Sequence, residues 1–134
     1  MNISNYLRVW LSAIRPKTLG AAVSPILIGT TMAFGEGKGH ALAALAALLG
    51  ALLIQIGTNF SNDYFDYIKG ADTEERLGPV RVTQSGQVRP KTMLWNFVMV
   101  FGLATLVGIY LVSRGGWPIV IIGILSIASG ILYT

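Results

Sequence analysis

The sequence predicts an all-α protein, a polytopic bundle of membrane-spanning helices. More than half of the 134 residues are apolar (53%), 12% are charged and the mean hydropathy is +0.62. These values are typical of membrane proteins rather than soluble ones. The charged residues also gather in one segment, 59–91, with long apolar stretches on both sides. The absence of cysteine excludes disulfides and thiolate metal sites.

The first expected element is an amphipathic helix over residues 1–15, lying in the membrane interface. Its apolar side chains recur at helical spacing: Ile3, Leu7, Trp10, Leu11 and Ile14. Pro16 then ends this helix or opens the next one. Two functions stay open for the helix: seating the N-terminus and forming part of a substrate entrance.

Four membrane spans are expected to follow, and we place them at about 18–34, 41–60, 93–112 and 117–134. Ser24-Pro25 should kink the first span, because proline removes a backbone donor. Small residues in the second span, Ala46, Gly50 and Gly57, favour close helix packing in lipid. Basic residues give the orientation, since eight flank the N-terminus and the 61–92 loop and two lie in the other loops. The positive-inside rule therefore places the N-terminus and this loop in the cytoplasm, with the chain in the inner (plasma) membrane.

The 59–91 segment is the candidate functional site. It contains five of the six acidic residues and five of the ten basic ones. A carboxylate near the centre of a membrane helix costs about 2.5–3.5 kcal/mol, so such residues usually have a function. If the second span continues as helix, four side chains fall within an arc of about 100°: Asn59, Asn62, Asp63 and Asp66. Amide and carboxylate oxygens suit Mg²⁺, which takes phosphate oxygens as further ligands.

Residues further along the segment could complete such a site. Lys69, Arg81 and Arg89 could neutralise phosphate oxygens, and Gly86 would allow close backbone approach. The alternative for the stretch 74–76 is an ordinary solvated loop of mixed charge. The residues alone thus indicate an Mg²⁺-dependent membrane site for a phosphorylated, lipidic ligand.

Three motifs carry a resemblance to a known family. They are Asn62-Asp63-x-x-Asp66, Arg15-Pro16-Lys17-Thr18-Leu19 and the run from Leu77 to Gly86. With them the chain resembles the UbiA superfamily of intramembrane prenyltransferases, and in particular its menaquinone branch, 1,4-dihydroxy-2-naphthoate polyprenyltransferase. The resemblance implies a larger helical ring of which this chain supplies four spans. It also implies transfer of a polyprenyl group from polyprenyl diphosphate to 1,4-dihydroxy-2-naphthoate, with loss of the carboxyl group, giving demethylmenaquinone.

The resemblance also assigns roles to residues. Asp63 and Asp66 would be catalytic, and Asn62, Asp63 and Asp66 would hold Mg²⁺ with the diphosphate. The residues implied in substrate binding are Asn59, Asn62, Lys69, Asp72, Arg81, Gln84 and Ser85. Many relatives carry a further aspartate where this chain has Gly70, which leaves the role of Asp72 open. A second aspartate-rich motif of the family has no counterpart before Thr134. We therefore expect this chain to be the N-terminal half of such an enzyme, binding diphosphate weakly and not catalysing alone.

Two alternatives remain at this stage. A prenyltransferase of the same class could use another acceptor, such as 4-hydroxybenzoate, homogentisate, haem or a chlorophyllide. A non-catalytic membrane protein could instead bind or pass cations. The other three spans contain no acidic residue, which argues against a conduction path. The sequence predicts neither the prenyl chain length nor the oligomeric state.

Overall fold

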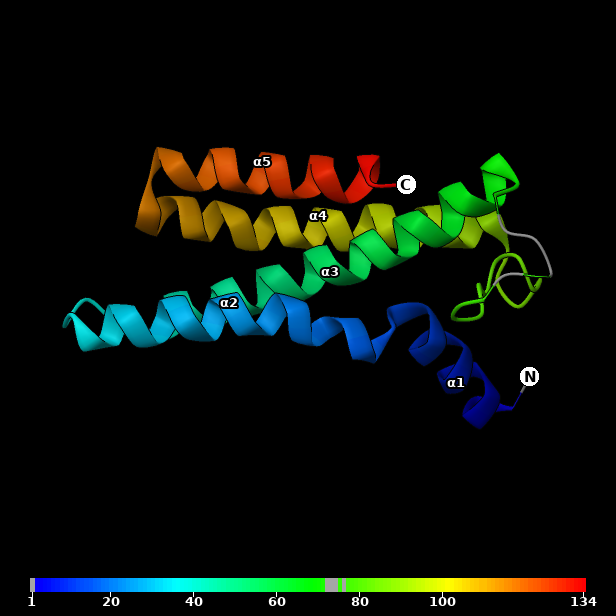
Figure 1. Cartoon of the computed structure of the whole chain (residues 1–134). Helices are drawn as coiled ribbons and strands as arrows, with labels where there is room; N and C mark the ends of the chain where they lie inside the picture. Colours follow the sequence, from blue (N-terminus) through cyan, green and yellow to red (C-terminus); the bar gives the residue numbers. More distant parts are fainter. Residues whose placement is uncertain (1, 72–74, 76) are drawn as a thin grey trace.

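Five helices make up the chain in the computed structural model, which describes residues 2–71, 75 and 77–134 (Figure 1). They are α1 (Ile3–Ile14), α2 (Pro16–Gly35), α3 (Ala41–Lys69), α4 (Pro90–Gly115) and α5 (Trp117–Leu132). Every regular element in the described ranges is helical. The predicted all-α membrane class is confirmed: α2, α3 and α4 are long and apolar enough to cross a membrane. With 16 residues, α5 is a shorter apolar helix.

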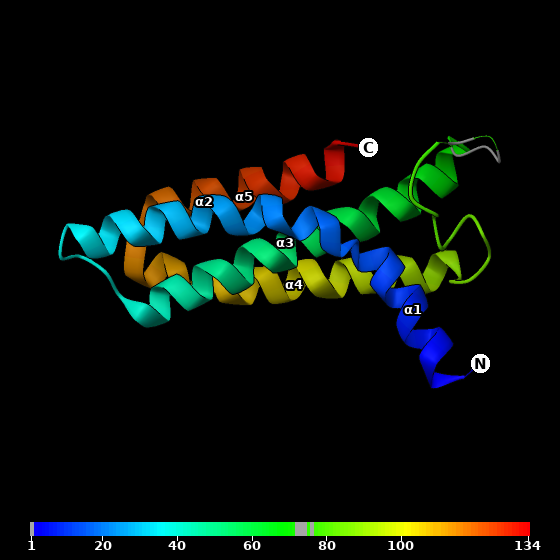
Figure 2. The same cartoon turned by 60° about the horizontal axis from the view of Figure 1, so that its bottom comes forward.

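Helix α3 is central to the bundle. It packs against α2 on one side and against α4 and α5 on the other, and α1 also contacts it (Figures 1 and 2). The α2–α3 and α4–α5 connections lie at one end of the bundle, whereas α1 and the 77–89 segment lie at the opposite end. This second end is where the described candidate residues of the 59–91 segment gather.

Helix α3 continues nine residues past the predicted end of its span, from position 60 to Lys69. Its 29 residues reach about 43 Å at 1.5 Å per residue. That length exceeds an apolar layer of about 30 Å, so the last turns carry polar side chains. Gly70, with a φ of 61°, ends the helix in the left-handed conformation that glycine adopts readily. The polar last turns of α3 therefore continue a membrane helix as one unbroken helix.

A one-residue corner joins α1 to α2. Arg15 adopts a left-handed conformation with a φ of 56°, and Pro16 takes the first position of α2. Proline is well suited to this position because its missing N–H would have no partner there. The hydroxyl of Thr18 donates a hydrogen bond to the carbonyl of Arg15 at 2.9 Å. The predicted break at Pro16 is thus a tight corner between two helices.

The buried core lies at the end of the bundle that carries the 77–89 segment. Val9 and Ala13 of α1 are buried there beside Phe60 of α3 and Val82 and Val88 of the segment. Aromatic rings extend this core along α3 and α4 through Tyr64, Phe65, Phe97 and Phe101. Most other large apolar side chains are exposed, as expected for helices that face lipid. The best-packed part of the chain therefore surrounds the candidate site.

Candidate active site

Four polar side chains lie on one buried face of α3, as the helical spacing predicted. Asn59 is 3% exposed, Asn62 8%, Asp63 1% and Asp66 9%. Asn62 and Asp63 are adjacent, and Asn59 and Asp66 lie three or four residues from each of them, so the four side chains follow one stripe along the last turns of the helix. Buried amides and carboxylates require partners. The partners come from three distant parts of the chain.

Asp63 binds the backbone of the segment that precedes α4. Its Oδ2 accepts a hydrogen bond from the N–H of Val82 at 3.2 Å, and its Oδ1 accepts one from the N–H of Thr83 at 3.1 Å. Both acceptor atoms belong to a carboxylate, and charge-assisted bonds of this kind are stronger than neutral ones. Asp63 thus joins α3 to a segment 19 and 20 residues later in the chain.

Asp66 forms an ion pair with Arg81. The Nη2 atom of the guanidinium donates a hydrogen bond to Oδ2 of the carboxylate, and both side chains are largely buried. Asp66 lies one helical turn after Asp63, and Arg81 directly precedes Val82. The two acidic residues of the motif therefore contact the same short piece of chain.

Asn59 binds the corner between α1 and α2. Its Nδ2 atom donates to the carbonyl oxygen of Ile14 at 2.8 Å and to the hydroxyl of Thr18 at 3.0 Å. Two motifs that the sequence analysis quoted separately, Arg15–Leu19 and Asn62–Asp66, therefore lie on contacting elements. The role of Asn59 in substrate binding stays a prediction. In the structure, its amide nitrogen joins the α1–α2 corner to α3 by hydrogen bonds.

The other candidates lie around this centre. The hydroxyl of Thr134 donates to Oδ1 of Asn62, and Nζ of Lys69 donates to the backbone oxygen of Thr134. Gln84 and Ser85 are exposed, and the Ser85 hydroxyl donates to the carbonyl of Val82 at 3.3 Å. Asp72 lies outside the described residues.

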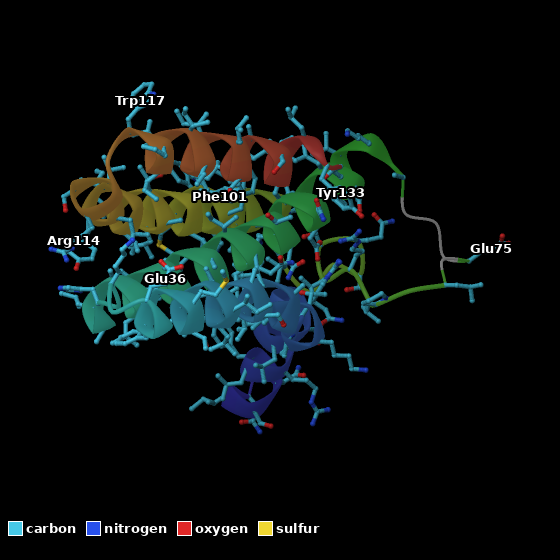
Figure 3. All side chains as sticks on the ribbon, turned by 60° about the vertical axis from the view of Figure 1, so that its left-hand side comes forward. Glu36, Glu75, Phe101, Arg114, Trp117 and Tyr133 are labelled. Carbon is cyan, nitrogen blue, oxygen red and sulfur yellow. The ribbon has the colours of Figure 1, made fainter. Side chains whose placement is uncertain are left out.

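The residues labelled in Figure 3 show which side chains lie at each end of the bundle. Glu36, Arg114 and Trp117 lie at the end opposite to Tyr133 and Glu75. Glu36 forms an exposed ion pair with Lys38 at 3.7 Å, of a kind that contributes little to stability. The Asp66–Arg81 ion pair at the site is therefore buried, whereas the Glu36–Lys38 pair at the other end is exposed to solvent.

The sequence did not indicate the roles of Val82 and Thr83. Their backbone N–H groups donate the two hydrogen bonds that the Asp63 carboxylate accepts. Val82 is fully buried and Thr83 is 2% exposed. The available signal was the short run of small polar residues after Arg81, which resembles a turn. A side-chain pattern does not reveal which backbone donors a turn presents.

The donor set fits a hard cation. In the described ranges no three His, Cys, Asp or Glu side chains group as a metal site. Mg²⁺, however, is commonly bound by one or two carboxylates, with substrate phosphates and water completing the shell. Asn62 and Asp66 offer amide and carboxylate oxygens, and the buried hydroxyls of Ser61 and Thr83 have no hydrogen-bond partner among the described residues. The residues present therefore suit Mg²⁺ together with a polar ligand.

A cavity of about 450 Å³ opens between α1 and the 80–87 segment. Arg8, Asn5 and Ser12 line it from α1, and Val80 and Gln87 line it from the segment. This volume lies in the range of small-molecule sites. Val80, which lines the cavity, directly precedes Arg81 in the chain.

Comparison with known proteins gives a consistent result. The sequence profile of the UbiA prenyltransferase family matches residues 22–134. The 1,4-dihydroxy-2-naphthoate octaprenyltransferase of Bacillus subtilis is 38% identical over 120 residues, which cover 90% of this chain and 39% of that protein. The protein of the same name from Escherichia coli is 38% identical over 133 residues, covering 95% and 43%.

A further relative has a different prenyl group in its name. The 2-carboxy-1,4-naphthoquinone phytyltransferase of Synechocystis is 33% identical over 97 residues, covering 72% of this chain and 31% of that protein. No solved structure matches the chain. The chain spans about two fifths of the length of the first two relatives.

Proposed function

The chain belongs to the UbiA prenyltransferase family, and we propose that it forms the diphosphate-binding part of a prenyltransferase of menaquinone biosynthesis. The donor would be a polyprenyl diphosphate and the acceptor 1,4-dihydroxy-2-naphthoate. The names of the relatives support this choice: they differ in the prenyl group but share a naphthalene ring system with a carboxyl group. The product is the quinol form of demethylmenaquinone.

The observation that carries the proposal is the buried polar stripe of α3 with Arg81 beside it. Carboxylate oxygens, an amide and a guanidinium lie at one end of a bundle whose helices expose many large apolar side chains. A polyprenyl diphosphate has the same division, with a charged head and a long apolar tail. Its head would lie against the stripe and its tail along the exposed apolar helices.

The reaction breaks the C–O bond between the prenyl group and diphosphate, and the diphosphate leaves with the bonding electrons. The acceptor ring then forms a C–C bond to the prenyl carbon. The bond to the carboxyl carbon breaks, and its electrons return to the ring as CO₂ leaves, so no external oxidant is needed.

The residues of the chain have distinct tasks in this scheme. Asn62 and Asp66 would hold Mg²⁺, which would supply positive charge against the leaving diphosphate. Arg81 donates hydrogen bonds to diphosphate oxygens. The packed core around Phe60 and Val82 limits access of water, which would otherwise quench the allylic cation.

The cavity between α1 and the 80–87 segment is the proposed route for the acceptor. Arg8 provides a cation at this cavity, suited to a carboxylate. The predicted orientation agrees with this route, since α1 and the segment lie at the same end of the bundle (Figure 1). Basic residues cluster at that end, so we assign it to the cytoplasmic side of the inner membrane.

The test uses membranes from cells that express the complete coding sequence containing this chain, because the 134 residues alone are not expected to catalyse. The substrates are a polyprenyl diphosphate and 1,4-dihydroxy-2-naphthoate. We expect a prenylated naphthoquinol in the presence of Mg²⁺ and none with EDTA. Equimolar 4-hydroxybenzoate serves as a competing acceptor, because a second acceptor class was left open by the sequence. Prenylation of 4-hydroxybenzoate alone would contradict the proposed acceptor, and no Mg²⁺-dependent product with either acceptor would contradict the proposed reaction.

A further inference from the structure

We propose that Asp63 is a positioning residue that holds the backbone of the 81–88 segment, rather than a metal ligand. Asp63 would thereby set the position of Arg81. The inference deepens the proposed function, on which it rests for what Arg81 binds. The contacts from which it is argued do not depend on that function.

The first argument is that both oxygens of the Asp63 carboxylate bind backbone and that the residue is buried. Each of its oxygens already accepts one backbone N–H, and the whole residue is 1% exposed. A metal ligand needs an oxygen that faces the ion and its other ligands. Asp63 instead faces Val82 and Thr83, of which the first is 0% and the second 2% exposed.

The second argument is that the anchored segment is a closed unit. The N–H of Val88 donates to the carbonyl of Val82 at 3.0 Å, and the N–H of Ser85 donates to that of Arg81 at 2.9 Å. The N–H of Gly86, whose φ of +74° suits glycine, donates to the carbonyl of Thr83 at 3.1 Å. Fixing two consecutive amides of so compact a turn fixes the whole turn.

The third argument is that Asp63 and Asp66 bind different groups of the same short segment, one its backbone and the other a side chain. Asp63 holds the backbone directly after Arg81, while Asp66, one turn later, holds the Arg81 side chain. Without Asp63, the Arg81 guanidinium would still be attracted to Asp66. The backbone directly after Arg81, however, would lose the two hydrogen bonds that hold it to α3. Asp63 therefore acts on the diphosphate site through Arg81.

The test measures backbone hydrogen exchange of the 134-residue chain in lipid nanodiscs, with EDTA and without any substrate. Mass spectrometry at single-residue resolution follows the amides of Val82 and Thr83. In the wild-type chain we expect both to exchange at least about tenfold more slowly than unprotected amides, because each is bonded to a carboxylate. Unprotected exchange of both amides in the wild-type chain would overturn the proposal.

Variants separate the anchor from a metal ligand. Asp63→Asn should speed exchange by about tenfold at the amide that faces the new NH₂ group, because its acceptor is replaced by a donor. Asp66→Asn should leave the amides of Val82 and Thr83 protected. Glu36→Gln removes an exposed charge at the other end and should change nothing.

The second readout is Mn²⁺ binding by electron paramagnetic resonance, without diphosphate. Asp66→Asn should weaken it by about tenfold or more, as loss of a ligand does, and Asp63→Asn by less than about threefold. Asp63→Asn with unchanged exchange and Mn²⁺ binding weakened as much as in Asp66→Asn would overturn the proposal. If Asp63→Asn does not fold, Asp63→Glu decides, since a longer carboxylate keeps a metal donor but misplaces the anchor. Lack of prenyl transfer would contradict the proposed function and leave the exchange result standing.

Discussion

A methyl group at position 57 should weaken the packing of α3 on α4. A Cβ atom on Gly57 would lie 2.8, 2.9 and 3.0 Å from three ring carbons of Phe101. The ring has little room to retreat, because Phe101 is 7% exposed and packs edge-on against Phe97 at 6.3 Å between centroids. Gly57→Ala therefore forces the two helices apart or rotates a buried ring.

Two opposing effects set the size of the change. Alanine favours a helix over glycine by about 0.8–1 kcal/mol, and overpacking of a core costs about 1–3 kcal/mol. Gly102→Ala on α4 is a matched control, since a Cβ there meets nothing within 4 Å. Gly102→Ala should be neutral or stabilising, and Gly57→Ala should be less stable than it by about 1–3 kcal/mol.

Unfolding in mixed micelles with increasing SDS, followed by tryptophan fluorescence, measures this difference. Circular dichroism of both variants in the absence of SDS shows that they start from the same helix content. If Gly57→Ala were as stable as Gly102→Ala, the close contact of Gly57 with Phe101 would not exist in the membrane-like environment, and the described packing of α3 on α4 would be refuted.

Two further predictions concern the elements around the site. Asn59→Ala removes the hydrogen bonds to Ile14 and Thr18 and should destabilise the chain by about 1–3 kcal/mol, with faster hydrogen exchange in α1; unchanged exchange there would contradict the described tie. Arg8→Gln should raise KM for 1,4-dihydroxy-2-naphthoate by about tenfold, as for loss of a charge-assisted bond, with KM for the prenyl diphosphate unchanged. Arg114→Gln at the other end is the control for the membrane assay, and an equal effect of both arginine variants would rule out the acceptor route.

The sequence predicted those features of the fold that depend on local periodicity. Apolar runs and helical spacing indicated the membrane helices and put Asn59, Asn62, Asp63 and Asp66 on one face. Such reasoning needs only a rise and an angle per residue. It placed the end of the second span at position 60 because polarity begins there, whereas α3 continues as helix to Lys69. Hydropathy reports where the apolar layer ends, and a helix does not have to end with it.

The partners of these side chains could not be predicted in the same way. The bonds from Asp63 cross 19 and 20 residues, and the bond from Asn59 to Ile14 crosses 45. They form only because the 81–88 turn and the α1–α2 corner fold back onto α3. The helical spacing of side chains within α3 carries no information about these tertiary contacts. From the sequence, Arg81 was expected to contact phosphate. Its ion pair with Asp66 adds a contact within the protein that the sequence did not indicate.

The central claim is that the polar end of α3 and the 81–88 turn bind the diphosphate head of a prenyl donor. The most direct measurement is photolabelling in membranes with a prenyl diphosphate that carries a photoreactive group on its first isoprene unit, followed by peptide mapping. We predict Mg²⁺-dependent labelling within residues 59–69 or 81–88, reduced by unlabelled prenyl diphosphate. Labelling confined to residues 35–41 at the other end, or labelling that neither Mg²⁺ nor the competitor affects, would contradict the account.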